Sequence, residues 1–354
     1  MRALLRILAT LLLAGQNGGP AHPSLSDRLD ALPPAATRVE RHGRTLIIEL
    51  PPQDLPPADG GEIMVRTPVY RVDIPVSGSI HRYRVEVVDG NGDSLPRSVL
   101  HHVNLNDPSR RELFAPIMLH VLAASKETPS PSVPWLLFGM PISAGDRYVL
   151  SGMLANDGPT PVTGATIRIV LDLTPPGRPW PLWDAYPWGM DVKFPVGAEG
   201  GSKAFDLPPG RSSHWWESSP AIPGTILGLG GHVHDYAVRI EFKDMTANAV
   251  LWETVPERSA SGAVMRVPLT RFYSWHRLGK RVEPTHRYRV TVEYDNPTAD
   301  TLRGAGMGSV GGVVVPDGAW PRVDPTNPDY LADLTNTLEH FGAGRLGAVH
   351  QHHH

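Results

Sequence analysis

Apolar and polar residues alternate at every second position in many short segments of the chain, which is the pattern of β-strands that bury one face. The alternating segments of the first half are residues 81–88, 98–105, 147–154 and 165–173. Those of the second half are residues 235–242, 249–255, 263–269, 286–294 and 311–316. This pattern predicts an all-β chain of two jelly-roll-like antiparallel β-sandwich domains.

Glycine and proline mark the ends of these segments. The 35 Gly and 37 Pro residues lie between the strands and do not form a low-complexity tract. Residues 176–220 are rich in Pro, Gly and Trp, which predicts a connection between a sandwich at 38–175 and a second at 221–320. In the tail, 321–354, Asn327 and Pro328 are a suitable N-cap and first residue for a short helix that runs to about Phe341.

The N-terminal residues 1–21 have the pattern of a secretory signal, because Arg2 and Arg6 flank a short apolar run. Gln16 stands where a lipoprotein would need cysteine, so we expect no membrane anchor and a secreted or periplasmic protein. The chain has no cysteine, which excludes a disulfide framework and thiolate metal ligands. Its net charge of -3 and the lack of a basic patch argue against a nucleic-acid partner.

Two histidine clusters and one methionine are the candidate metal ligands. His101 and His102 are consecutive, and His232 and His234 alternate on a predicted strand, so that the latter pair shares one face. Met307 follows in a glycine-rich segment, where the backbone can approach its neighbours closely. Imidazole binds both oxidation states of copper, and a thioether favours Cu(I). The residues therefore suggest two copper ions.

In order and spacing, these ligands resemble those of the copper type II, ascorbate-dependent monooxygenases, which include peptidylglycine α-hydroxylating monooxygenase and dopamine β-monooxygenase. His102 and His232 are 130 residues apart, and His234 and Met307 are 73 apart. The resemblance implies that His232, His234 and Met307 hold the oxygen-activating copper, and that His101 and His102 belong to an electron-transfer copper. It also implies a small-molecule substrate and an external reductant such as ascorbate. The absence of cysteine suggests a prokaryotic relative.

The third ligand of the first site is open, because the family's later histidine has no counterpart in residues 151–158. A hairpin turn at residues 89–93 would place His81 opposite His101 or His102. Met153 is the alternative, as a thioether on the strand where the histidine is missing. Consecutive histidines point to opposite faces of a regular strand, so a shared ion also requires a bend or bulge.

The resemblance does not extend to the substrate. In the peptide-amidating enzymes an Arg two residues before the His-x-His motif and a Tyr four residues after the Met bind a carboxylate, and this chain has Gly230 and Gly311 at those positions. A copper monooxygenase of another substrate, a non-catalytic copper-binding or assembly protein, and an extracellular interaction module all remain open. The terminal histidines, His350 and 352–354, are native or an added tail, and we leave them out of the site.

Overall fold

The computed structural model describes residues 23–58, 61–126, 128, 130–177, 179–194, 203–259, 263–274 and 276–340. The predicted signal segment and the terminal histidines lie outside these residues. Residues 1–32 and 33–354 are two separate compact units. In the first, α1 (Leu25–Asp30) begins with a capping box in which Ser24 and Asp27 bond each other's backbone. No helix in the described residues is both long and apolar enough to cross a bilayer.

The first set of strands, up to residue 184, forms two facing sheets. One has the order β1-β2-β11-β6-β9-β12 with β3 beside β11, and the other has the order β4-β10-β7-β8 with β5 beside β10. The strands are β1 (Ala36–Glu40), β2 (Thr45–Glu49), β3 (Gln53–Leu55), β4 (Ile63–Arg66), β5 (Tyr70–Asp73), β6 (Gly78–Val88), β7 (Leu100–Arg111), β8 (Met118–Ser125), β9 (Phe138–Ile142), β10 (Arg147–Asn156), β11 (Val162–Thr174) and β12 (Trp183–Asp184). The sheets pack tightly: a Cβ on Gly152 of β10 would lie only 2.7 Å from Cδ1 of Ile167 on β11.

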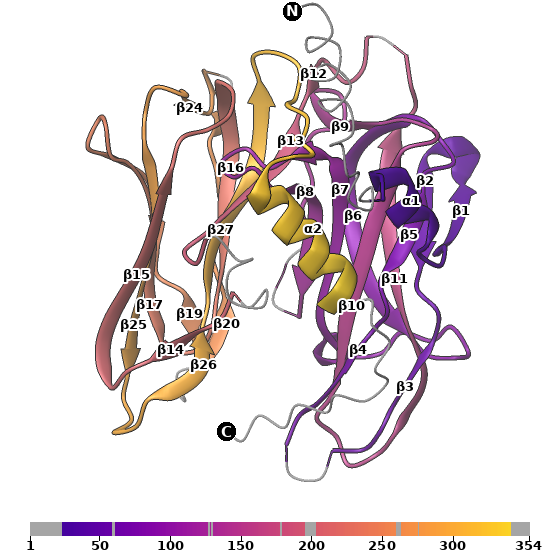
Figure 1. Ribbon diagram of the computed structural model, residues 1–354, viewed down its shortest axis with the longest axis horizontal. Helices are drawn as coiled ribbons and strands as arrows, with labels where there is room; N and C mark the ends of the chain where they lie inside the picture. The colour runs from indigo at the N-terminus through magenta and orange to yellow at the C-terminus, as the bar shows by residue number, and fades with distance from the viewer. Residues whose placement is uncertain are drawn as a thin grey trace, which may run out of the picture. The chain divides into compact units, whose positions relative to one another are not determined.

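The second set of strands, from residue 186, also forms two facing sheets (Figure 1). Their orders are β13-β27-β16-β21, with β24 beside β16, and β15-β25-β17-β18. The strands are β13 (Tyr186–Asp191), β14 (Phe205–Leu207), β15 (Gly210–Ser218), β16 (Gly224–Val233), β17 (Ala237–Asp244), β18 (Ala249–Thr254), β19 (Glu257–Arg258), β20 (Val264–Arg266), β21 (Thr270–Arg271), β22 (Tyr273–Ser274), β23 (Arg277–Leu278), β24 (Lys280–Val282), β25 (Tyr288–Asn296), β26 (Leu302–Gly306) and β27 (Gly308–Pro316). The pairs β14-β26, β19-β20 and β22-β23 are small separate ladders.

The architecture confirms the predicted fold class of two antiparallel sandwiches with a short C-terminal helix. The helix α2 (Pro328–His340) begins where predicted, because Oδ1 of Asn327 accepts hydrogen bonds from the backbone N–H groups of Asp329 and Tyr330. It lies against the first set of strands, where the Tyr330 hydroxyl donates to the carbonyl of Pro108 at 3.0 Å. The exact domain boundaries stay a prediction.

One aromatic side chain joins the two sets of strands. Phe114, in the loop between β7 and β8, is 1% exposed and lies against Trp188 of β13, Phe242 of β17 and Tyr288 of β25. The ring centroids are 5.0 to 5.7 Å apart, within the range of favourable aromatic pairs. The loop of the first sandwich thus inserts into the core of the second.

The hairpin predicted at residues 89–93 extends only a few residues. The turn itself forms, since the N–H of Asp89 donates to the carbonyl of Asp93, and Val88 bridges Ser94. Beyond it, however, β6 pairs with β11 and β9, whereas β7 pairs with β10 and β8 in the facing sheet. The chain crosses from one sheet to the other after the turn, because each strand buries its apolar face in the same core.

Candidate metal centre

A β-bulge at His101 turns the first histidine pair. In the ladder between β7 and β10, His102 pairs with Met153 and Leu100 pairs with Leu154, so that His101 is the extra residue. A bulge bends its strand and redirects the side chains next to it. The His101 and His102 ring centroids are 5.3 Å apart, at an interplanar angle of 55°. The structure therefore contains the bulge that a shared ion requires.

His102 lies on the face of its sheet that points away from the interior of the first sandwich. Val103 and Gly152, the next pair in the ladder, face the interior, where Val103 is fully buried. Because side chains alternate along a strand, His102 and its partner Met153 lie on the opposite face. Met153 is 6% exposed and belongs to a small apolar cluster with Met64 and Ala155, apart from the main core. The first pair thus lies beside a thioether.

Burial, together with the charges of His101, His232, Arg66 and Lys203, lowers the pKa of His102 to about 3. The imidazole is therefore neutral at physiological pH, which is the form that binds a metal ion. The contribution of His232 indicates that the two histidine clusters, 130 residues apart in the sequence, are near enough in space for their charges to interact.

The second pair lies at the end of β16. His232 pairs with Ser309 of β27, and the His232 and His234 ring centroids are 5.2 Å apart at 89°. Val233 between them is 3% exposed and belongs to the main core, so the two imidazoles share the other face. Nδ1 of His234 lies 3.1 Å from the carbonyl oxygen of Ala305, which orients the imidazole ring.

Met307 lies between β26 and β27, opposite His234. The ladder ends at the pair Val233 and Gly308, and its continuation would pair His234 with Met307 on the same face. The glycines beside Met307 are required by close packing. A Cβ on Gly308 would lie 2.6 Å from Cγ1 of Val292, and one on Gly306 would overlap the ring of Phe205. The glycine-rich segment thus allows the close backbone approach predicted from the sequence.

The hydroxyl of Tyr294 connects His234 with Met307. Tyr294 comes from β25 in the facing sheet and is fully buried. Its hydroxyl donates to the carbonyl of Met307 and accepts from the N–H groups of Met307 and His234, both at 3.1 Å. The ladder between β16 and β27 ends at Val233 and Gly308, and beyond this pair the hydroxyl takes the place of the backbone hydrogen bonds between the strands. Burial raises the pKa of Tyr294 to about 12, so the phenol keeps its proton. The alternation pattern gave no sign of this role.

The placement of His81 beside the first pair is wrong. His81 lies on β6, in the sheet opposite to that of His101 and His102, and its Nδ1 is 3.3 Å from the hydroxyl of Thr174. Nor do three His, Cys, Asp or Glu side chains gather into a metal-binding group anywhere in the described part of the chain. Within the described residues, neither pair therefore has a third His, Cys, Asp or Glu donor beside it. Met153 and Met307 are the thioethers that the strand register places opposite His102 and His234.

A buried carboxylate fixes part of the junction between the two sandwiches. Glu112 is 1% exposed, and its Oε1 accepts from the backbone N–H of His120 at 2.9 Å and lies 3.0 Å from His120 Nδ1. Its Oε2 accepts from the N–H of Gly189 on β13 at 3.0 Å. Because every oxygen has a donor, we assign this group to structure.

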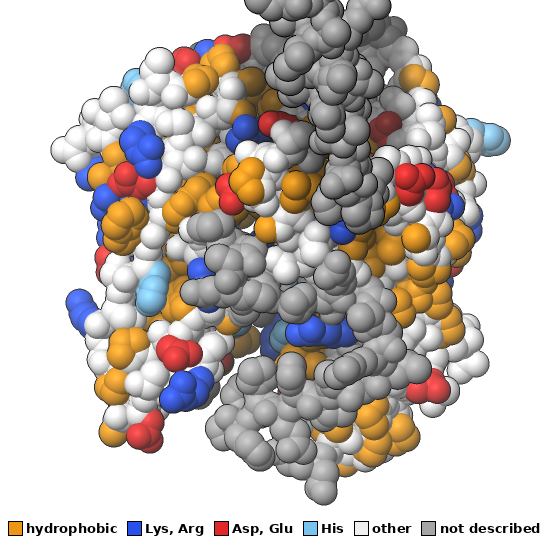
Figure 2. Space-filling model, in the orientation of Figure 1, with side chains coloured by type: hydrophobic (Ala, Val, Ile, Leu, Met, Phe, Trp, Pro, Cys, Tyr) orange, Lys and Arg blue, Asp and Glu red, His pale blue; other side chains and the backbone are white. Residues whose placement is uncertain are grey.

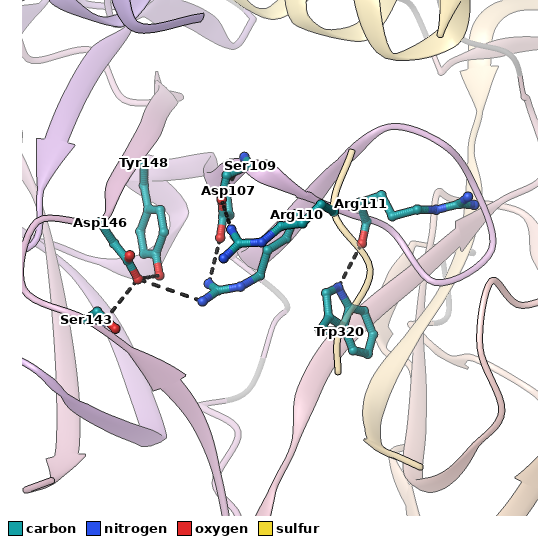
Figure 3. Close-up of polar contacts among 9 residues, drawn as sticks. Asp107, Ser109, Arg110, Arg111, Ser143, Asp146, Tyr148 and Trp320 are labelled. Carbon is teal, nitrogen blue, oxygen red and sulfur yellow. Dashed lines mark hydrogen bonds and ion pairs between the residues drawn. The ribbon is translucent and has the colours of Figure 1, made fainter. Parts of the chain in front are cut away.

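A second polar network holds the far end of β7 (Figure 3). Nη1 of Arg110 lies 2.7 Å from the carboxylate of the buried Asp107, and its Nη2 is 3.9 Å from Asp146. The indole N–H of Trp320 donates to the carbonyl of Arg111 at 2.9 Å.

At the surface, charges of both signs are interspersed over the described part of the visible face (Figure 2). Neither arrangement offers a metal site.

No protein-family model matches the chain, and no curated protein matches it. Among solved structures, it is similar to that of infectious bursal disease virus strain Gx, at 12% identity over 82% of this chain and 75% of the other, with a TM-score of 0.24. PNGF-II is 7% identical over 79% and 61%, with a TM-score of 0.29. The Sputnik virophage structure is 8% identical over 89% and 90%, with a TM-score of 0.22. At these values no function follows for this chain.

Proposed function

We propose that the chain binds two copper ions and is a secreted or periplasmic copper-dependent monooxygenase that hydroxylates a C–H bond of a small substrate. The observation that carries the proposal is the presence of two imidazole pairs, with ring centroids 5.3 and 5.2 Å apart, near enough to each other for the charge of His232 to influence His102. The ligand order and spacing, similar to those of the ascorbate-dependent copper monooxygenases, support it.

The side chains present suit copper. His101 and His102 would hold the first ion, and His232, His234 and Met307 the second. The neutral state of His102 and the hydrogen bonds of Tyr294 favour binding, because they keep donors unprotonated and in place. Bound copper would supply oxygen activation and single-electron transfer. The overall reaction consumes the substrate C–H bond, O2, two electrons from a reductant such as ascorbate and two protons, and it yields the alcohol and water.

The substrate would not be held by its carboxylate. Gly230 and Gly311, at the positions of the family's Arg and Tyr, pair directly with each other across β16 and β27. Gly311 also pairs with Gly189 of β13, so that three glycines form a row beside His232. No side chain in this row can bind an anion. We therefore propose a substrate other than a peptidylglycine.

The experiment is copper analysis followed by oxygen uptake. A variant with Gln at His350, His352, His353 and His354 removes tail binding and serves as the background. We expect two copper equivalents per chain, one in His232→Ala and one in His102→Ala, whereas His214→Ala keeps two. Ascorbate-dependent oxygen uptake coupled to hydroxylated product supports the enzyme. Two tightly bound coppers without substrate-coupled uptake would instead establish a copper-binding or assembly protein, which the thioether beside each pair favours.

A further inference from the structure

We propose that Sδ of Met153 is the third ligand of the first copper ion, so that this centre consists of His101, His102 and Met153. The inference rests on the proposed function. It gives both centres the same donors, two imidazoles and one thioether, and decides between the two third ligands that the sequence left open, His81 and Met153.

The first step of the argument is strand register. Met153 on β10 pairs directly with His102 on β7. Directly opposed residues of an antiparallel ladder point to the same face, with Cβ atoms about 4.5–5.5 Å apart. The bulge residue His101 follows at this same point of the ladder, between the pairs His102–Met153 and Leu100–Leu154. The two imidazoles and the thioether are thus neighbours through backbone geometry alone.

The second step is the environment of Met153. Leu154 and Gly152, which flank Met153 on β10, face the interior of the first sandwich. Met153 therefore lies on the outer face with His102. That face is largely covered, since Met153 is only 6% exposed and His102 is half-buried. Its apolar companions there are Met64 and Ala155. A thioether that is shielded from water beside two imidazoles suits Cu(I).

The third step is elimination among the described residues. His81 belongs to the facing sheet, and no set of three His, Cys, Asp or Glu side chains forms a metal group. Ser125, which pairs with His102 on the other side, bonds its hydroxyl to that of Thr128 at 3.0 Å. A serine hydroxyl is in any case a poor donor for copper compared with a thioether.

Sulfur coordination can be counted directly by X-ray absorption of the protein reduced to Cu(I), in the background without tail histidines. The wild type is expected to bind two coppers, each with one sulfur. Met153→Leu conserves side-chain volume and should halve the total copper–sulfur signal, as should Met307→Leu. The double variant should have none. Met64→Leu is the matched control on the neighbouring strand β4 and should leave the signal intact.

The outcomes separate the two proposals. Two bound coppers whose sulfur signal disappears entirely in Met307→Leu would overturn Met153 as a ligand and leave the proposed function standing. Loss of signal in Met64→Leu but not in Met153→Leu would overturn it in favour of Met64. Fewer than two coppers in the wild type would overturn both. A wild type with two coppers and only one sulfur would already contradict a thioether at each centre, even if a variant fails to fold.

Discussion

The Tyr294 hydroxyl and the backbone of Met307 bond each other in both directions, because the hydroxyl donates to the Met307 carbonyl and accepts from its N–H. The same oxygen accepts from the N–H of His234. One buried phenol from the facing sheet thus positions two of the proposed copper ligands. This makes Tyr294 a positioning residue whose removal can be tested apart from the ligands themselves.

Tyr294→Phe should lower the free energy of unfolding by about 1–3 kcal/mol, because it leaves the buried backbone groups of His234 and Met307 without their partner. It should also weaken copper binding at the second site and leave the first unchanged. Urea denaturation and copper competition titrations measure the two effects. Tyr288→Phe is the control, since this buried tyrosine accepts from Glu283 N–H and is bonded to none of the proposed copper ligands in the described contacts. Equal copper affinities in both variants would contradict the positioning role.

His81→Ala should keep two copper equivalents, because His81 lies on β6, in the sheet opposite the His101–His102 pair. Its only expected cost is the contact with Thr174, worth about 1 kcal/mol. The copper content per chain is measured in His81→Ala and, for comparison, in His102→Ala. A loss of one equivalent in His81→Ala would show that the ring takes part in the site after all.

Phe114→Ala should destabilise the protein by about 3–5 kcal/mol, the usual cost of removing a fully buried phenylalanine. Because the ring packs among Trp188, Phe242 and Tyr288 of the second sandwich, its loss weakens the junction as well as one core. Tryptophan fluorescence and circular dichroism during urea denaturation measure the effect. Two separate transitions in the variant, against one in the wild type, would mark uncoupled sandwiches.

Asp333 gives the protein a pH-dependent stability. Burial raises its pKa above 3.8, although His120 and the Met118 N–H oppose the shift. The folded state therefore binds more protons than the unfolded state, and this contribution to stability falls as pH rises from 3.8 through the native pKa. Asp333→Asn removes the dependence. Urea denaturation at pH 4 to 7 measures the unfolding free energies of the wild type and the variant. The value of the wild type minus that of the variant should decline as pH rises. A difference that stays constant or rises with pH would contradict the role of Asp333.

Local pattern predicted the strands well, and it predicted their partners poorly. Alternation placed β6, β7, β10 and β11 close to their observed positions, because it records which face of a strand is buried. It does not record which strand lies alongside. The turn at residues 89–93 therefore indicated a hairpin, whereas the chain crosses between sheets there, and His81 was placed wrongly for that reason.

In the candidate site, too, strand periodicity predicted some features, whereas others depend on how the sheets pack. The face shared by His232 and His234 and the need for a bulge at the His101–His102 pair follow from strand periodicity, and both agree with the structure. The contribution of Tyr294 could not be predicted, since it depends on how closely two sheets approach. That approach is set by core packing between residues 60 positions apart.

The position of Tyr294 on the facing sheet has a consequence for how the second centre can be tuned. The hydroxyl reaches His234 and Met307 across the full thickness of the sandwich, so the spacing between the two sheets determines where these donors stand. Val292, two residues before Tyr294 on β25, packs so closely against Gly308 that a Cβ there would lie 2.6 Å from Val292 Cγ1. Changes of volume deep in the core, at residues that never approach an ion, would therefore move the donors and adjust the metal preference of the centre.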